Sequence, residues 1–428
     1  MSASDRSLLR ESNFSRLWWG QFFSITGDRF TYLALAGMLF EHSRQEQTAS
    51  YGALLAVLAN VVIAPVLLFA PFTGAWVDRL NLQRVLVVSD TLRALLVLAI
   101  PWVYAATGRA EAAFALVFLL FTANVVFLPA KSALVPEIVP RENLLAANSL
   151  LAIAGVAATG IGALVGGLVI DRWGWAVAMR VDAVSYFVSA ITLALVRYDA
   201  ASHHARQLPI TLRRYVREVT EGWRLLRGNA AVSVGILALG AVWYAGGVLH
   251  VAGNEHVQEA ASTPGMVRLG VLLFAIGAGS GIGTWWINTR GSGRPRAAVL
   301  GGGLVLAGLA LVPMATSTLF AVFVVAACLA GMFVAPILVL TETVLQQGTE
   351  LAHRARVFSA RDFLMRLTLL ASVSSTAWLT GVSSSPTALL VCALLLIAIG
   401  AATLVISGRR GSTLPLRGDP RPLQQSVR

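Results

Sequence analysis

The chain has 428 residues, of which 57% are hydrophobic and only 13% are charged. Soluble domains carry about 25% charged residues, so this composition excludes a soluble enzyme. About twelve helices of about 20 residues each would absorb roughly 240 positions, which predicts a polytopic membrane protein. The two cysteines, Cys328 and Cys392, both lie inside apolar runs. Neither a disulfide framework nor a cysteine-based metal site is therefore expected.

Apolar runs long enough to cross a bilayer follow one another along most of the chain. We interpret all of them as helices, because lipid offers no partner to unpaired backbone groups and the runs are too continuously apolar for barrel strands. The sequence therefore predicts an all-α membrane protein. Its twelve spans are expected at about 15–39, 51–76, 85–107, 112–134, 145–170, 175–196, 230–252, 267–287, 297–315, 319–342, 359–381 and 386–407.

Basic residues are distributed unevenly between the two sides of these spans. With a cytoplasmic N-terminus, only four arginines fall in the outward loops: Arg44, Arg109, Arg172 and Arg268. Three more lie inside the spans: Arg29, Arg93 and Arg180. The other basic residues lie at or near the inner face, which predicts that both termini are cytoplasmic. The first 13 residues are charged and polar, so no cleavable signal peptide is expected.

A long polar connection at 197–229 separates six spans from six. Its second half alternates apolar and charged faces with helical spacing, which predicts an amphipathic helix on the inner leaflet; a calmodulin-like or nucleic-acid-binding role is the alternative. The cytoplasmic turns of the two halves recur at an offset of roughly 210 residues, as two homologous bundles with a cavity between them would produce. We predict bundles at 1–196 and 230–407, and a disordered cytoplasmic tail at 408–428.

The end of the second span contains a glycine followed by an acidic and a basic residue, Gly74, Asp78 and Arg79, and Arg84 opens the third span. Gly74 permits close helix approach, and Asp78 can face the N-terminal dipole of a neighbouring helix, such as the eleventh. Arg79 and Arg84 would pair with acids or lipid phosphate. This stretch resembles the G-x-x-x-D-R-x-x-R gate signature of the major facilitator superfamily, although a loop that follows the positive-inside rule would also contain Asp-Arg.

A second stretch carries a more specific resemblance. Residues 127–150 are similar to the connection between spans four and five in the macrolide-efflux and enterobactin-exporter branch of that superfamily. Further similar segments lie between Phe14 and Phe363, at 27–29, 90–94, 182–186 and 354–359. Gly162–Gly167 is similar to the antiporter signature G-P-x-x-G-G, with Ala163 in place of proline, but tight packing of small residues explains these glycines equally well.

The resemblance implies a major facilitator fold of two pseudo-symmetric six-helix bundles. It implies a transporter of the bacterial plasma membrane that exports drugs, antibiotics or siderophores, often driven by the proton gradient. The expected partners are a small-molecule substrate, protons and membrane lipid, with no nucleic acid and no cofactor, and the expected state is a monomer.

Three acidic residues inside the spans are candidates for proton coupling: Asp28, Asp182 and Glu342. A charged carboxylate at the bilayer centre costs about 2.5–3.5 kcal/mol on insertion scales, so each needs a partner or a proton. Asp28 could instead be a permanent ion-pair partner of Arg93. Asp182 could be held by hydrogen bonds to Ser185 or Tyr186, and Glu342 could simply reach water.

Other polar residues inside the spans are candidates for a gate or a substrate cavity. Asp90 and Arg93 stand three residues apart on one helical face, which predicts either a gate lock or a structural salt bridge. The residues expected to line a cavity are Arg29, Asn60, Asn124, Trp243 and Tyr244. Arg29 would favour anionic or carbonyl-rich substrates.

Absent motifs narrow the function. No phosphate-binding G-x-x-x-x-G-K-[ST] loop and no H-E-x-x-H motif occur, and the six histidines are scattered or in loops, so we expect neither ATP hydrolysis nor a metal-dependent enzyme. The predicted function is proton-coupled export of small hydrophobic molecules. An uptake symporter or a uniporter on the same fold is the alternative, and a membrane-embedded enzyme or sensor is the alternative from another class.

Overall fold

Twelve long helices make up most of the described part of the chain. The computed structural model describes residues 8–9, 11–46, 50–77, 80–140, 143–197, 216–217, 220–221, 223–224, 230–260, 265–291, 295–347 and 351–409. The N-terminal half contains α2 (Ser12–Glu46), α3 (Tyr51–Val77), α4 (Leu82–Thr107), α5 (Ala110–Ile138), α6 (Leu144–Trp173) and α7 (Trp175–Ala194). The C-terminal half contains α9 (Ala230–Val248), η3 (Leu249–Gly253), α10 (Asn254–Glu259), α11 (Met266–Arg290), α12 (Arg296–Thr316), α13 (Phe320–Gln347), α14 (Leu351–Val382) and α15 (Ser385–Arg409). The elements α9, η3 and α10 form one continuous helix.

Eleven of these helices in the described residues are long and apolar enough to cross a membrane. The exception is α2, which carries Arg16, Asp28 and Arg29 and is too polar to pass the same test. It nevertheless lies within the bundle, packed against α6 and α7. The predicted fold class is therefore confirmed, with α2 as a membrane-length helix of which Asp28 and Arg29 line a cavity between the helices.

Several helices continue beyond the predicted spans. The seventh was expected to end at residue 252 but runs to Glu259 through the π-helical turn η3, and the eleventh was expected to begin at 359 but begins at Leu351. Hydropathy detects only the lipid-crossing part of a helix, whereas the backbone ladder continues into polar residues. Most of the predicted linker helix and the segment 410–428 lie outside the described residues.

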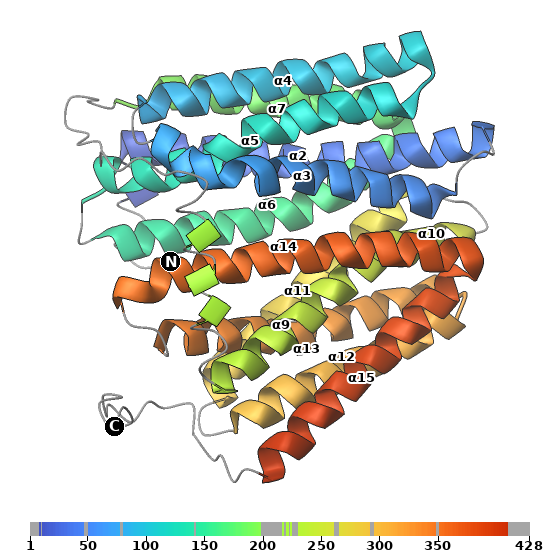
Figure 1. Ribbon diagram of the computed structural model, residues 1–428. Coiled ribbons are helices and arrows are strands. Elements are labelled where there is room, and N and C mark those ends of the chain that lie inside the picture. Colours follow the sequence, from blue (N-terminus) through green and yellow to red (C-terminus); the bar gives the residue numbers. More distant parts are fainter. Residues whose placement is uncertain are drawn as a thin grey trace.

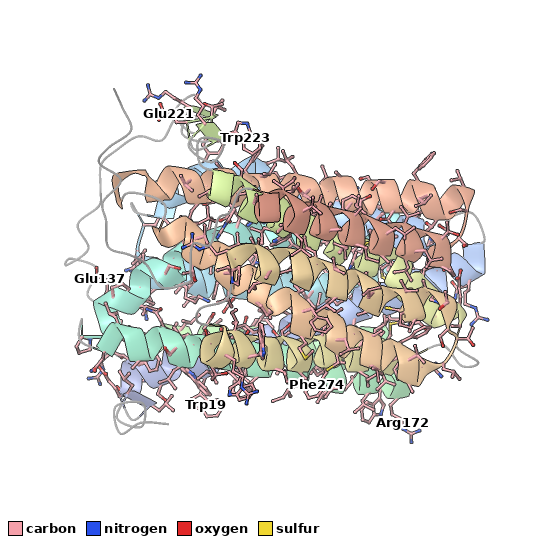
Figure 2. The ribbon with its side chains drawn as sticks, turned by 90° about the horizontal axis from the view of Figure 1, so that it is seen from below. Trp19, Glu137, Arg172, Glu221, Trp223 and Phe274 are labelled. Atoms are coloured by element: carbon pink, nitrogen blue, oxygen red, sulfur yellow. The ribbon has the colours of Figure 1, made fainter. Side chains whose placement is uncertain are left out.

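The two halves lie side by side, with the start of α2 and the end of α15 at the same end of the molecule (Figure 1). We name this the terminal end and the opposite one the distal end. Figure 2 shows Glu137, in the last turn of α5, at the terminal end and Arg172, in the last turn of α6, at the distal end. In Figure 1 α9, α12 and α15 slope away from the N-terminal half as they approach the terminal end.

The halves pack tightly through α6 against α11 and through α3 against α14. Two glycines allow the close approach of α6 and α11. A Cβ at Gly167 would lie 2.6 Å from the Cα of Val267, and one at Gly270 would overlap the carbonyl of Ala163. Small residues at such positions let two helix backbones approach without a side chain between them. This contact lies at the end of α6 and the start of α11, and therefore at the distal end.

Two carboxylates strengthen the distal contact, each reaching from one half to the other. Asp171 of α6 accepts hydrogen bonds from the backbone amides of Met266 (2.6 Å) and Val267 (2.9 Å), which open α11. Glu255 of α10 accepts from the amide of Gly52 in the first turn of α3 (3.0 Å) and from Ser385 Oγ (2.7 Å). The first amides of a helix have no internal partner and lie at its positive dipole end, so a carboxylate there is favourable.

We predict that Asp171→Ala loosens the distal contact. Because Asp171 is exposed, its hydrogen bonds stabilise the closed distal contact by only about 1 kcal/mol. Losing them corresponds to roughly a fivefold shift in population toward a state open at the distal end. Spin labels at Trp102→Cys and Leu319→Cys, both exposed and on different halves, report this opening by pulsed electron resonance in a Cys328→Ala, Cys392→Ala background. Glu111→Gln, an exposed acid in the first turn of α5, is the control. Identical distance distributions for Asp171→Ala and the control would contradict the role of Asp171.

Candidate functional site

The main cavity has a volume of about 590 Å³ and is lined by both halves. A cavity of this size suits a drug-sized molecule. The N-terminal half contributes most of the polar side chains, from α2, α4, α5 and α7, whereas α3, α13 and α14 contribute apolar ones. The C-terminal half adds Trp243 of α9 and His250 of η3. The cavity therefore has a polar wall and an apolar wall.

Helix α4 supplies the centre of the polar wall. Its start is fixed by Asn81, whose side chain accepts from the amide of Arg84 (3.0 Å), and its end by Gly108 in the left-handed conformation at φ 64°. Between these caps, Asp90 and Arg93 lie one turn apart with their side chains paired. Both are buried, at 0% and 2% exposure.

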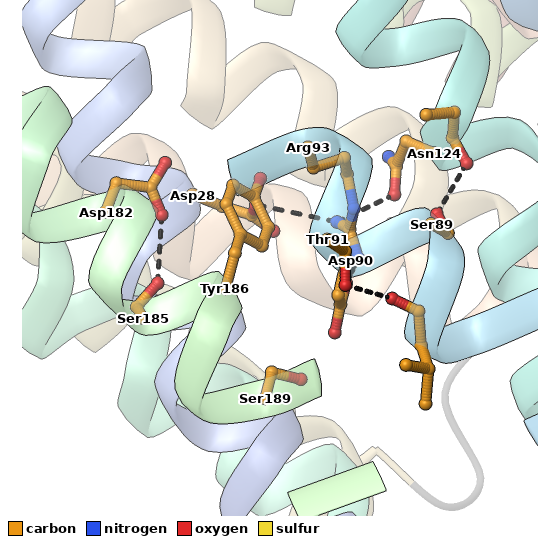
Figure 3. Close-up of polar contacts among 12 residues, drawn as sticks. Asp28, Ser89, Asp90, Thr91, Arg93, Asn124, Asp182, Ser185, Tyr186 and Ser189 are labelled. Carbon is orange, nitrogen blue, oxygen red and sulfur yellow. Dashed lines mark hydrogen bonds and ion pairs between the residues drawn. The ribbon is translucent and has the colours of Figure 1, made fainter. Parts of the chain in front are cut away.

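Several partners surround the guanidinium of Arg93 (Figure 3), although its Nε is buried without a hydrogen bond. Besides Asp90, its guanidinium donates to Asn124 Oδ1 (3.2 Å), and one of its nitrogens lies 4.0 Å from Asp28 Oδ1. The rings of Phe127 and Tyr186 lie 4.4 and 4.5 Å from its central carbon. Aromatic faces attract a cation, and more strongly when it is desolvated. Arg93 is thus a fixed positive centre shared by α2, α4, α5 and α7.

Asp28 connects this centre to the cavity. It lines the cavity, with 34% of its side chain exposed, and accepts a hydrogen bond from the Tyr186 hydroxyl. It faces Arg93 at 4.0 Å without a direct hydrogen bond. Asp28 is therefore a carboxylate that a molecule or a proton can reach from the cavity.

Asp182 lies behind the polar wall and is fully buried. It accepts hydrogen bonds from the hydroxyls of Thr31 and Ser185, the latter at 3.0 Å, and no arginine or lysine contacts it within the described residues. A Cβ at Gly27 would overlap the side chains of Asp182 and Ser185, so glycine is what lets α2 approach α7 here.

Acidic and basic side chains gather at this centre. Asp28, Asp90 and Asp182 all interact electrostatically with Arg93, and Asp28 also interacts with Lys131 of α5. The position of each charged group in this site therefore depends on the others.

The other residues expected at a gate or as coupling acids lie elsewhere. Glu342 is paired with Arg361 near the terminal end and is 43% exposed. Arg84 is exposed in the first turn of α4, and Gly74 lies in the last turn of α3. Asp78 and Arg79 lie outside the described residues.

Of the five residues expected to line a cavity, Arg29, Asn124 and Trp243 line the main one and two do not. Tyr244 lines a second cavity of about 500 Å³ between α9, α14 and α15, and its hydroxyl bonds Ser375 Oγ (2.9 Å). It follows Trp243 by one residue and so points about 100° away. Asn60 lies between the halves, where its amide donates to Ser374 Oγ (3.3 Å).

Sequence reasoning missed two residues of the cavity, Tyr32 and His250. The Tyr32 hydroxyl lies 2.7 Å from His250 Nδ1, which joins α2 to η3 across the two halves. The histidines were expected to be scattered or in loops, and His250 lies in a π-helical turn, an element frequent at functional sites. The available signal was a titratable residue inside a predicted span.

We predict that Arg93→Gln is destabilising because it leaves Asp90 buried without a cation. Removing one partner of a buried ion pair costs about 3–5 kcal/mol, whereas removing both costs much less. Thermal unfolding in detergent should therefore show a large loss for Arg93→Gln and recovery in Asp90→Asn/Arg93→Gln. Arg84→Gln, at an exposed position of the same helix, should change little. Equal losses for the single and the double variant would contradict this description of the pair.

Comparisons with known proteins agree with this architecture. The model of the Major Facilitator Superfamily matches residues 17–368. Macrolide efflux protein A of Streptococcus pyogenes is 22% identical over 83% of this chain and 86% of its own length. A Bacillus subtilis protein named as a candidate bacilysin exporter, BacE, is 24% identical over 82% and 84%.

Other similarities are shorter or more distant. The uncharacterized MFS-type transporter YvqJ of Bacillus subtilis is 26% identical, and the match spans half of each chain. A crystal structure of the peptide transporter POT is 13% identical with a TM-score of 0.72, covering 96% of this chain and all of that one, and so shows a shared fold. The chain belongs to the major facilitator superfamily of membrane transporters.

Proposed function

We propose that the protein is a proton-coupled secondary transporter that exports small, largely hydrophobic molecules from the bacterial cytoplasm. The observation that supports it most directly is the group of three carboxyls around Arg93, one of which, Asp28, opens onto the cavity between the two halves. Relatives named for macrolide efflux and bacilysin export favour the outward direction.

Alternating access requires a central site and two gates. The cavity lies between the halves, and the bonds of Asp171 and Glu255 hold the halves together at the distal end. The sequence concentrates basic residues in the connections expected at the terminal end, which supports a cytoplasmic location of that end under the positive-inside rule. In this orientation the distal bonds close the outer gate. Rocking of one half against the other would break them and expose the cavity to the outside.

Asp28 is the group that couples a proton to this movement. When ionised, it attracts Arg93 and accepts from Tyr186. When protonated, it loses the attraction to Arg93, which keeps Asp90 and Asn124 as partners. A change of charge here alters the contacts between α2, α4 and α7, and the same carboxyl is reachable from the cavity. Asp182, behind it, is a second place where the proton could reside.

We predict that Asp28→Asn abolishes transport driven by a pH gradient, because the amide keeps the shape but cannot exchange a proton. Purified protein in liposomes is assayed with a macrolide and with bacilysin under an imposed gradient, and for exchange without one. The variant should lose gradient-driven flux at least about tenfold while exchange continues, since one lost proton step is worth more than 1.4 kcal/mol.

Glu111→Gln, with its exposed acid far from the cavity wall, is the matched control and should behave as wild type. Normal gradient-driven flux in Asp28→Asn would exclude Asp28 as the coupling site. If substrate instead accumulated on the side toward which protons flow, the protein would be an uptake symporter and not an exporter. Product formation in detergent without a gradient would indicate an enzyme.

A further inference from the structure

The cavity contains two arginines in very different situations. Arg93 is compensated by carboxylates and an amide, as described above. Arg29 also lines the cavity, yet no carboxylate pairs with it within the described residues. Its Nε, like that of Arg93, is buried without a hydrogen-bond partner. A cation at this depth is costly unless something neutralises it. The cavity therefore presents one uncompensated positive charge.

His250 presents a second unpaired nitrogen from the opposite half. Its Nδ1 contacts the Tyr32 hydroxyl, and its Nε2 is buried without a partner. Where the Tyr32 hydroxyl donates to Nδ1, neutral His250 carries its hydrogen on Nε2 and offers a donor there.

Arg29, Tyr32 and His250 all line the main cavity, and Tyr32 contacts His250. Arg29 and Tyr32 lie three residues apart and therefore on the same side of α2, and all three side chains line the same cavity. We infer that the transported molecule carries an acidic group, a carboxylate or a phosphate, held between Arg29 of the N-terminal half and His250 of the C-terminal half. This inference rests on the proposed transport function and names its substrate class.

The rest of the wall fits the remainder of such a molecule. Val62 and Ile63 of α3, Leu338 of α13 and Leu369 of α14 surround the space with apolar surface. Trp243 adds an aromatic face from α9. An amphiphile with one acidic group and an apolar body satisfies both walls.

Because the acidic group binds both halves at once, its binding is coupled to the relative movement of the halves. Arg29 belongs to α2, whereas His250 belongs to the π-helical turn that continues α9 into α10. Five residues further along the same helix, Glu255 makes the distal bond to Gly52 of α3. An acidic group that bridges Arg29 and His250 therefore acts on the same helix that closes the distal end.

The test is an equilibrium measurement on the full chain in uncharged maltoside detergent, without any gradient. Dissociation constants are obtained from titrated thermal stabilisation for two matched pairs: 1-naphthaleneacetate against its neutral amide, and a lysophosphatidate against the monoacylglycerol of the same chain. We expect an acid to bind about tenfold or more tightly than its neutral partner, the effect of one charge-assisted hydrogen bond. If both acids bind more tightly than their neutral partners, the result supports recognition of an acidic group in general. A preference for the naphthyl acid alone would indicate a soluble substrate, and a preference for the lysophosphatidate alone would indicate a lipid-derived one.

Variants assign the preference to residues. Arg29→Gln should remove it, Arg29→Lys should keep part of it, and His250→Gln should weaken binding of the acid without changing that of the neutral partner. Arg180→Gln, a change at an exposed arginine of the spanning helix α7, is the control. Equal affinities within both pairs, binding of neither acid, or an unchanged preference in Arg29→Gln would overturn the inference. Because no gradient is applied, failure of proton coupling would leave these results intact.

Discussion

A charge inside a membrane must be neutralised, and this constraint organises the N-terminal half of the protein. Arg93 is almost completely buried, and four helices supply what surrounds it: carboxylates from α2 and α4, an amide from α5 and a ring from α7. These contacts fix how the helices pack around one point. The packing of these helices and the proposed proton coupling therefore depend on the same side chains.

The C-terminal half is built differently. Its contribution to the cavity is largely apolar, and its polar residues His250, Asn254 and Glu255 are concentrated where α9 passes through a π-helical turn into α10. This short stretch contacts Tyr32 of α2 and Gly52 of α3. It is thus the place where the cavity and the distal closure meet. A rigid-body movement of the halves would change both sets of contacts together.

Much of the architecture follows from the sequence because hydropathy and lipid impose strong limits on membrane proteins. The twelve helices and the division into halves were predictable, and the spacing of Asp90 and Arg93 indicated their pairing. Asn124 and Arg29 were recognisable as polar residues at mid-span depth. Tyr244 and Asn60 met the same criterion, but helix rotation places them elsewhere. The Tyr32–His250 contact joins residues 218 positions apart through a π-helical turn, and no local pattern encodes either feature.

The central claim is that the carboxyl group at Arg93 changes its protonation state. Infrared difference spectroscopy during a pH titration in lipid measures this directly, because a protonated carboxyl has its own carbonyl stretch. We expect wild type to gain and lose this band reversibly across the titration, and Asp28→Asn to lose the component assigned to Asp28. If Asp28 stays ionised throughout the titration, both when the outer gate is trapped open and when it is trapped closed, the spectra would show a permanent ion pair and contradict the account.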